Sequence, residues 1–381
     1  MNLRGMAWNH SRGFLPMVAT AQRYGEAHPD VEIVWEKRSL QEFADYPVEK
    51  LAASYDLVVI DHPFIGHAAR RGLFLPLDLH LDSDFLADQA ANSVGPSHAS
   101  YLWDGHQWAL AIDAAAPVSS WRRDLLERAG ATVPQNWEEV LALARRGLVA
   151  IPAVPVDALM NFFMFCSNLG EDPFSRPDRV VTAEVGEPAL VQLRAITSLC
   201  PPEIFGRNPI AIYEAMCSSD AIAYCPFAYG YSNYARRGYA ARVLEFGDVP
   251  PTGTLAQGRA TLGGAGLAIF SSSRNQQAAL DYARYVASPE CQRTLYVESG
   301  GQPAHRAAWQ DEEANHLTGG YFRQTLPALD RAYLRPRYDG YVEFQDAAGA
   351  VVQEYLRAGG NPGAILSRLE EIFHRTRPGK L

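Results

Sequence analysis

The residues whose side chains are best suited to catalysis or ligand binding form two short clusters, one at the end of each of two expected β-strands. The first is Trp8-Asn9-His10-Ser11-Arg12-Gly13 and the second is Asp61-His62-Pro63. A histidine titrates near neutral pH, and an aspartate can orient it and fix its tautomer, as in many general bases. Because side chains alternate along an extended chain, we expect Asp61 to orient His10 rather than its neighbour His62.

The first cluster also has the features of a ligand site. Free backbone donors and the dipole at the amino end of a helix favour an anionic or strongly polar group. Trp8 could stack on a ring, and Arg12 could grip a carboxylate through two parallel hydrogen bonds. The simpler alternative is that Asn9 or Ser11 only caps the next helix and Arg12 points to solvent. For the second cluster it is a capping Asp61 beside a half-exposed His62.

A third candidate is Asp113, which ends the apolar run of residues 109–112. A carboxylate in such a run is costly unless it is paired or solvated, so Asp113 either borders a ligand or pairs at a hinge. Three alanines follow it and leave room for a ligand or for movement. In the run Gly263-Gly264-Ala265-Gly266 the backbone can approach a ligand closely, and Gly264 is our candidate contact.

A fourth candidate is an aromatic run that we expect to form a loop over residues 226–234, after a strand at 221–225. Its rings are spaced so that they could stack on a ligand and offer phenolic hydroxyls. The alternative, a place in the hydrophobic core, fits about half of them. Tyr229 and Tyr231 are our candidate ligand contacts. The run consists of Tyr224, Phe227, Tyr229, Tyr231 and Tyr234.

Composition excludes several classes of function. The net charge of -9 makes nucleic acid an improbable partner, and no apolar stretch is long enough to span a membrane. Five cysteines, an odd number in apolar contexts, predict buried free thiols and suit a reducing compartment. Motifs of serine hydrolases, nucleotide-binding loops and zinc peptidases are missing, so no cofactor and no metal is predicted.

The order of expected elements predicts an α/β protein. The first hundred residues alternate strand and helix, and a capping box, Ser39-Leu40-Gln41-Glu42, opens one of the helices. The middle of the chain is mostly helical, and a strand returns near residue 261. The expected strands are 3–8, 31–36, 56–60, 221–225 and 261–269; the expected helices are 14–27, 64–71, 159–169, 188–199, 210–217, 276–287 and 362–375.

Two segments resemble one family. Residues 101–113 form a hairpin with an Asp-Gly turn and an apolar strand, and a helix opening at Asn136 follows; residues 261–303 return as a strand, two helices and a Gly-Gly turn. This pattern resembles the family 1 extracellular solute-binding proteins, the maltose-binding-protein-like receptors of carbohydrate-type ABC transporters. The resemblance implies a two-lobed, periplasmic-binding-protein-like (type II) α/β fold with hinge crossings. Lobe 1 would comprise residues 1–112 and 263–310, and lobe 2 residues 113–262 and 311–381.

The resemblance also implies a function. A polar small molecule, a sugar or a sugar-like acid, would bind between the lobes, outside the carboxyl ends of strands, and close them. The candidate contacts are those already described, and the resemblance adds Gln302 and His305. Lys37 and Arg38, at the end of the second strand, could supply cations, and ordinary surface charge is the simpler interpretation. An ABC permease would be the partner of an exported protein.

Two expectations about location and activity remain open beside each other. Met1 leads directly into the first strand without a secretory signal, so we expect a cytoplasmic protein as the sequence stands and a periplasmic one if a signal was removed. The alternative function is a cytoplasmic enzyme on the same scaffold. It would use His10, Asp61, His62 and Asp113 as general acids and bases.

Overall fold

The structure is a computed structural model that describes residues 1–38, 48–253 and 255–377. The chain forms two compact units. Unit 1 comprises Met1–Ala115, Gly263–Leu326 and Arg337–Asp339, and unit 2 comprises Ala116–Leu262, Pro327–Pro336 and Gly340–Leu381. We expected divisions after residues 112, 262 and 310, whereas the structure has them after 115, 262 and 326. Residues 311–326 join unit 1 through the fully buried Trp309. Its ring centroid lies 5.1 Å from that of Phe322, and its carbonyl oxygen accepts a hydrogen bond from the Asn315 side chain.

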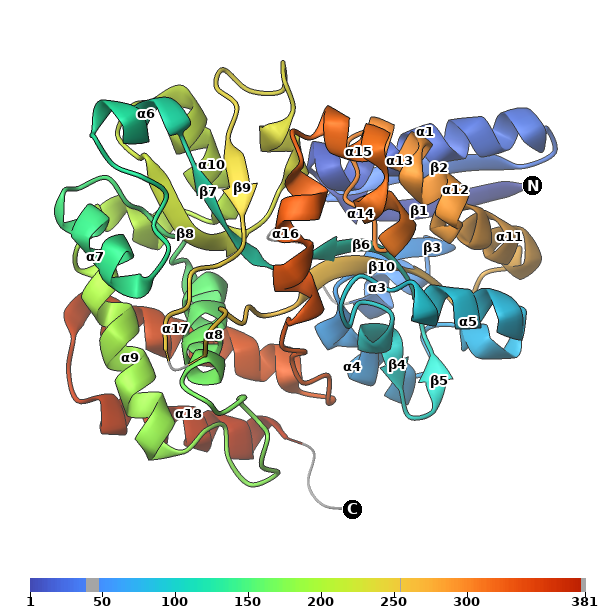
Figure 1. The fold of residues 1–381 in the computed structure, drawn as a ribbon. Helices are drawn as coiled ribbons and strands as arrows, with labels where there is room; N and C mark the ends of the chain where they lie inside the picture. The colour runs from blue at the N-terminus through green and yellow to red at the C-terminus, as the bar shows by residue number, and fades with distance from the viewer. Residues whose placement is uncertain (39–47, 254, 378–381) are drawn as a thin grey trace. The chain divides into compact units, whose positions relative to one another are not determined.

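Unit 1 is built on a five-stranded mixed sheet (Figure 1). The strand order is β2 (Glu32–Arg38), β1 (Asn2–Trp8), β3 (Leu57–Ile60), β10 (Gly263–Ile269), β6 (Leu110–Ala115). Strands β1, β2 and β3 are parallel, and β10 runs antiparallel to both β3 and β6. The carboxyl ends of β1, β2, β3 and β6 therefore meet the amino end of β10 at one edge, which we call the strand-end edge.

Helices cover both faces of this sheet because its strands are apolar on both sides; all four residues of β3 are buried. Helix α1 (Ser11–Ala27) and helix α11 (Gln276–Ala287) lie together on one face, where the Tyr282 hydroxyl contacts Thr20 at 2.9 Å and accepts from Trp35 at 3.1 Å. The other described elements of unit 1 are α3 (Val48–Ala52), η1 (His62–Phe64), α4 (Ile65–Arg70), η2 (Leu77–Leu79), α5 (Ser83–Ala91), η3 (Ala99–Tyr101), β4 (Leu102–Trp103), β5 (His106–Gln107), α12 (Pro289–Arg293), α13 (Leu295–Glu298), α14 (Arg306–Gln310), α15 (Glu312–Leu317) and most of α16 (Tyr321–Asp330).

Unit 2 combines a small antiparallel sheet, in the order β8 (Tyr224–Tyr229), β7 (Pro117–Trp121), β9 (Glu245–Gly247), with helices. Helix α8 (Pro155–Asn168) is buried at every residue from Asp157 onward, as a helix that is apolar all round must be. The other elements are α6 (Arg123–Arg128), α7 (Trp137–Arg145), α9 (Ala183–Thr197), η4 (Pro202–Gly206), α10 (Pro209–Ser218), η5 (Ser232–Ala235), α17 (Tyr341–Ala358) and α18 (Pro362–Thr376).

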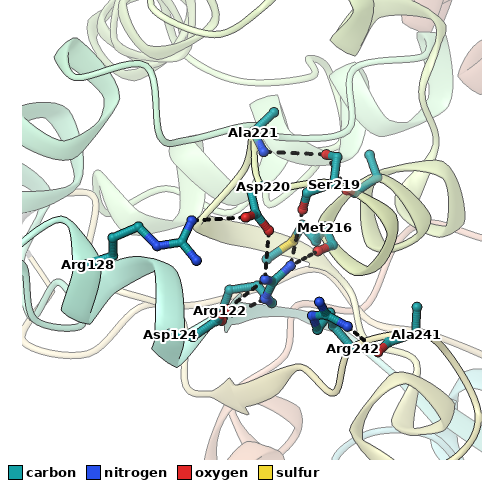
Figure 2. A network of polar contacts seen from close by, with 10 residues as sticks. Arg122, Asp124, Arg128, Met216, Ser219, Asp220, Ala221, Ala241 and Arg242 are labelled. Atoms are coloured by element: carbon teal, nitrogen blue, oxygen red, sulfur yellow. Dashed lines mark hydrogen bonds and ion pairs between the residues drawn. The ribbon is translucent and has the colours of Figure 1, made fainter.

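A buried arginine ties the elements of unit 2 together (Figure 2). Arg122, 2% exposed, donates from Nε and Nη2 to the two carboxylate oxygens of Asp124 at 2.7 Å, and from Nη2 to Asp220 at 3.0 Å. Its Nη1 donates to the carbonyl oxygens of Met216 and Ser219, which are left without helical partners at the end of α10. One guanidinium thus joins the end of β7, the start of α6 and the end of α10.

Several expected elements differ in the structure. Residues 226–229, which we expected to begin a loop, instead continue strand β8, because side chains on both faces of this strand are buried. Helix α9 begins at Ala183 and contains Pro188, where we expected the helix to begin. The Ser39–Glu42 capping box lies outside the described residues. All five cysteines are free thiols, and four of them are buried.

Candidate functional site

The strand-end edge of unit 1 gathers most of the candidate residues. Trp8 ends β1, and His10 and Arg12 follow it at the start of α1. Asp61 and His62 follow β3, Asp113 lies near the end of β6, and Gly264 lies at the start of β10. The edge forms because the strands that end there are parallel neighbours or pair with β10. It is the usual position of a ligand site in an open α/β sheet.

A buried ion pair stands at the centre of this edge. The Arg12 guanidinium donates from Nε to Oδ2 of Asp113 at 2.8 Å, and from Nη2 to Oδ1. The two side chains are 4% and 1% exposed. Burial raises the pKa of Asp113, Arg12 acts in the opposite direction, and the charge of Asp61 raises it further. The alternative in which Arg12 points to solvent is wrong, and the bidentate grip that we expected for a ligand carboxylate is directed at Asp113.

His10 has a structural task in addition to any contact with ligand. Its Nδ1 accepts a hydrogen bond from the backbone N–H of Arg12 at 3.0 Å, so His10, and neither Asn9 nor Ser11, caps helix α1. Burial, and to a lesser degree the Arg12 charge, lowers the pKa of His10 to about 4. The ring is therefore neutral near pH 7, with its proton on Nε2 because Nδ1 is the acceptor.

Asp61 acts on its neighbour. Its Oδ1 accepts from the backbone N–H of His62 at 2.8 Å and lies 3.1 Å from the His62 Nδ1, so Asp61 contacts the neighbour that we expected it to leave to other partners. The reason is that residues 62–64 form a 3-10 turn, which Asp61 caps, instead of continuing the strand. His62 is fully buried, edge-on to the Tyr101 ring, whose hydroxyl donates to the Ile60 carbonyl at 3.1 Å.

The remaining candidates of unit 1 contact the backbone near the strand-end edge. The Trp8 ring lies against Gly13 and is 5% exposed. Gly264 has a φ of +101°, and a Cβ there would lie 2.3 Å from the Asp113 carbonyl oxygen, so β10 can meet β6 at this point only with glycine. Gln302 donates to the Ala114 carbonyl at 2.7 Å and so supports the same strand end.

The structure also shows the surroundings of three further residues that the sequence analysis named. The His305 Nε2 lies 3.2 Å from Asp88 Oδ2, and His305 caps α14. The Lys37 ammonium lies 5.2 Å over the Phe14 ring. Arg38, read from the sequence as surface charge, is 8% exposed at the end of β2, so that interpretation is wrong.

In unit 2, the aromatic run divides between core and partly exposed positions. Phe227 packs with Phe165 and Trp137 in the core, and Tyr224 and Tyr234 are also buried. Tyr229 is partly exposed, and its hydroxyl lies 3.0 Å from the hydroxyl of Thr261. Tyr231 is 7% exposed and stands edge-on to Tyr213 at 6.3 Å. Sequence reasoning missed Thr261, whose position beside Tyr229 follows only from the three-dimensional pairing.

Among the residues that the structure describes, no helix is long and apolar enough to cross a membrane. Across the same residues, no group of three or more histidine, cysteine, aspartate or glutamate side chains is placed to hold a metal ion.

Comparison with known proteins agrees with this architecture. A sequence profile described as "Bacterial extracellular solute-binding protein" matches residues 7–164. Maltose-bound MalE3 of T. maritima superposes with a TM-score of 0.85 at 17% identity, over 98% of this chain and 99% of that one. The GacH receptor of Streptomyces glaucescens, solved unliganded and with acarbose, gives 0.81 at 16% identity over 98% of both chains.

A solute-binding protein of an ABC transporter from Agrobacterium radiobacter, in complex with ribitol, gives a TM-score of 0.79 at 17% identity over 97% of both chains. A search of curated protein sequences finds no match. The expected resemblance to solute-binding proteins and the two-lobed α/β fold class are confirmed.

Proposed function

We propose that this protein is a solute-binding protein that binds a neutral, polyhydroxylated small molecule, a sugar or a polyol. The fold similarity supports a receptor, because the neighbours of this fold were solved with maltose, acarbose and ribitol. The observation that carries the choice of ligand is the buried Arg12–Asp113 pair. A sugar acid, which the sequence left open, would have to displace Asp113 from Arg12 before it could use that guanidinium.

The residues of unit 1 that we propose for the ligand are the members of the strand-end edge, and those of unit 2 are Tyr229 and Tyr231. His10 and Asp61 offer a hydrogen-bond donor and a charged acceptor, a combination that suits hydroxyl groups. The other members are Trp8, Arg12, His62, Asp113 and Gly264. The proposed location is outside the cytoplasmic membrane, and the proposed partner is an ABC permease.

The enzyme alternative is not proposed. It required His10 as a general base near neutral pH, but burial lowers the pKa of His10 to about 4 and its Nδ1 is committed to the helix cap. Asp113 is fully buried against Arg12 and is therefore unsuited to exchange protons with a substrate.

The test is a thermal-shift and calorimetric screen with maltose, glucose, ribitol and mannitol against glucuronate and gluconate, with every mixture checked for product. A ligand at a hundredfold excess over its Kd stabilises by about 2.7 kcal/mol, which is several degrees in Tm. Neutral compounds should stabilise the protein and remain unchanged. Stabilisation by the acids alone, or consumption of a compound, would overturn the proposal.

A pair of matched variants connects the screen to the site. Asp61→Asn removes a charged acceptor at the strand-end edge and should weaken the best neutral ligand at least tenfold. Asp78→Asn is the control, because Asp78 also pairs with a histidine of unit 1, His106 at 2.9 Å, but in the hairpin region. Equal affinity in the two variants would contradict the placement of the site.

A further inference from the structure

The chain enters unit 1 a third time for three residues only, Arg337–Asp339, between two stretches of unit 2. We call these residues the strap. At its amino end, the Arg337 Nη1 donates hydrogen bonds of 2.6, 3.0 and 2.9 Å to three backbone carbonyl oxygens, and the guanidinium lies 5.7 Å over the Trp103 ring. The three carbonyl groups belong to Ala99, Ser100 and Leu102.

The peptide that joins Arg337 to Tyr338 lies directly on helix α4. A Cβ built on Gly66 would fall 1.8 Å from the Arg337 carbonyl oxygen, so the strap backbone occupies the space that any other side chain at position 66 would need. This contact fixes the position of the strap on unit 1 independently of its charged ends.

The carboxyl end of the strap is held by charge. Asp339 Oδ1 lies 2.9 Å from the His67 Nδ1 and 3.0 Å from the Arg71 Nη1, and Oδ2 lies 3.6 Å from Arg70. The other ring nitrogen of His67, Nε2, forms a short contact with Glu49 of helix α3. His67 therefore stands between two carboxylates, with Arg70 and Arg71 of its own helix beside them; Arg71 also lies 3.5 Å from Glu49.

The protonation state of His67 decides how many of these contacts are hydrogen bonds. A neutral imidazole carries one N–H, so only the imidazolium can donate to Glu49 and to Asp339 at once. Burial alone would raise the pKa of Asp339, but hydrogen bonds from His67 and Arg71 lower it below its ordinary value. Burial would also raise the pKa of Glu49, but a backbone hydrogen bond and, after it, the hydrogen bond from His67 lower it below its ordinary value.

We propose that the strap is a proton-controlled latch: the His67 imidazolium holds its Asp339 end on unit 1, and loss of that proton loosens this end while Arg337 keeps the other end attached. After deprotonation, Glu49 and Asp339 compete for one N–H, and Arg70 and Arg71 retain part of the attraction. Because the group is partly exposed, with His67 30% and Asp339 19% exposed, the expected loosening is about fivefold in the population of the open strap. The inference concerns unit 1 and does not depend on the proposed ligand.

The test is limited proteolysis with chymotrypsin at the Tyr338–Asp339 bond, followed by mass spectrometry between pH 6 and pH 8.5. When opening is fast, the cleavage rate is proportional to the population in which the strap is open. Dividing this rate by the cleavage rate of a free peptide of residues 330–345 removes the pH dependence of the protease itself. Cleavage of the natural protein should rise about fivefold with pH. Its midpoint should coincide with the titration of the His67 ring in long-range 1H–15N NMR spectra.

Variants separate the latch from a general pH effect. His67→Gln should give the high-pH rate at every pH, and Arg337→Ala should open the strap at every pH. Glu49→Gln changes a partly exposed residue and removes the carboxylate that competes with Asp339 for the single N–H of neutral His67. Cleavage of this variant should therefore stay at the slow, low-pH rate at every pH. His106→Gln is the control, because His106 pairs with one carboxylate, Asp78, in another part of unit 1.

The control variant should behave as the natural protein does. A rate that does not change with pH in the natural protein, or a rise that persists in His67→Gln, would overturn the latch. So would a flattening of the pH dependence in His106→Gln.

Discussion

The buried carboxyl of Asp157 predicts an unusual pH dependence for unit 2. Asp157 lies in the first turn of α8 and is 5% exposed, and its Oδ2 has no hydrogen-bond partner within residues 1–38, 48–253 and 255–377. Burial raises its pKa from 3.8 to about 8. The folded protein thus keeps a proton that the unfolded chain releases above pH 4.

The sign of the effect follows from this difference. Because the folded-state pKa is the higher one, stability is greatest below pH 4 with respect to this group and falls as the pH rises toward 8. One proton corresponds to about 1.4 kcal/mol per pH unit, and the pKa differs by the interval from 3.8 to about 8, so the total loss is about 6 kcal/mol. Asp157→Asn removes the titrating carboxyl group. Between pH 5 and pH 7.5, the free energy of unfolding of the natural protein should therefore fall relative to that of the variant by about 1.4 kcal/mol per pH unit.

The assay is urea unfolding followed by tryptophan fluorescence and far-UV circular dichroism at half-unit pH steps. Trp137, which packs with Phe165 and Phe227, reports on unit 2. Asp84→Asn, at an exposed position in the first turn of α5, is the control and should leave the slope unchanged. Parallel stability curves for the natural protein and Asp157→Asn would refute the reasoning, because they would show that the carboxyl is ionised or solvated in the folded state.

Three further predictions concern the buried ion pair, the His10 ring and the buried guanidinium of unit 2. Asp113→Asn should destabilise unit 1 by about 3–5 kcal/mol in urea unfolding because it removes the carboxylate that compensates the buried Arg12 charge. Arg12→Met combined with Asp113→Leu should recover most of that loss; an equal loss in the single and the double variant would contradict this. His10 acts oppositely to Asp157: its folded-state pKa of about 4 lies below the ordinary 6.5, so its contribution is complete above pH 6.5 and is lost toward pH 4. His10→Asn should remove about 3 kcal/mol of this acid sensitivity, measured as the change in unfolding free energy between those pH values. Arg122→Lys should lower the free energy of unfolding of unit 2 by about 2–3 kcal/mol, nearly as much as Arg122→Ala, because an ammonium cannot reproduce the bidentate contact with Asp124; full stability in the lysine variant would refute that geometry.

Local sequence signals predicted the elements whose formation depends on local chemistry. The Asp-Gly turn between β4 and β5 adopts φ values of +51° at Asp104 and +82° at Gly105, as the dipeptide indicates. The apolar run 57–60 forms the buried strand β3, and Gln276–Ala287 is helix α11 with the expected bounds. In these segments, periodicity and turn residues agree with the final fold, so no distant contact was needed to place them.

Tertiary contacts decided the rest. Arg12 and Asp113 are 101 residues apart, and neither position indicates the other until β6 is placed in the sheet. Residues 226–229 form a strand instead of the expected loop. In sequence, aromatic rings that are buried on both faces of a sheet have the same spacing as rings on a loop that stacks on a ligand. The helix cap was assigned to Asn9 or Ser11 because histidine is a rare cap, and only the position of its Nδ1 reveals it.

The same ion pair connects stability with ligand selection. A receptor site needs polar groups that can be buried when ligand binds, and a buried charge is tolerable only if it is compensated. Arg12 is compensated within unit 1 by Asp113, so the strand-end edge carries a paired cation before any ligand arrives. An anionic ligand would leave either itself or Asp113 without that cation, whereas the hydroxyl groups of a sugar or polyol can bond to the edge and leave the pair intact. The cost of breaking this ion pair is the physical basis on which we propose a neutral ligand.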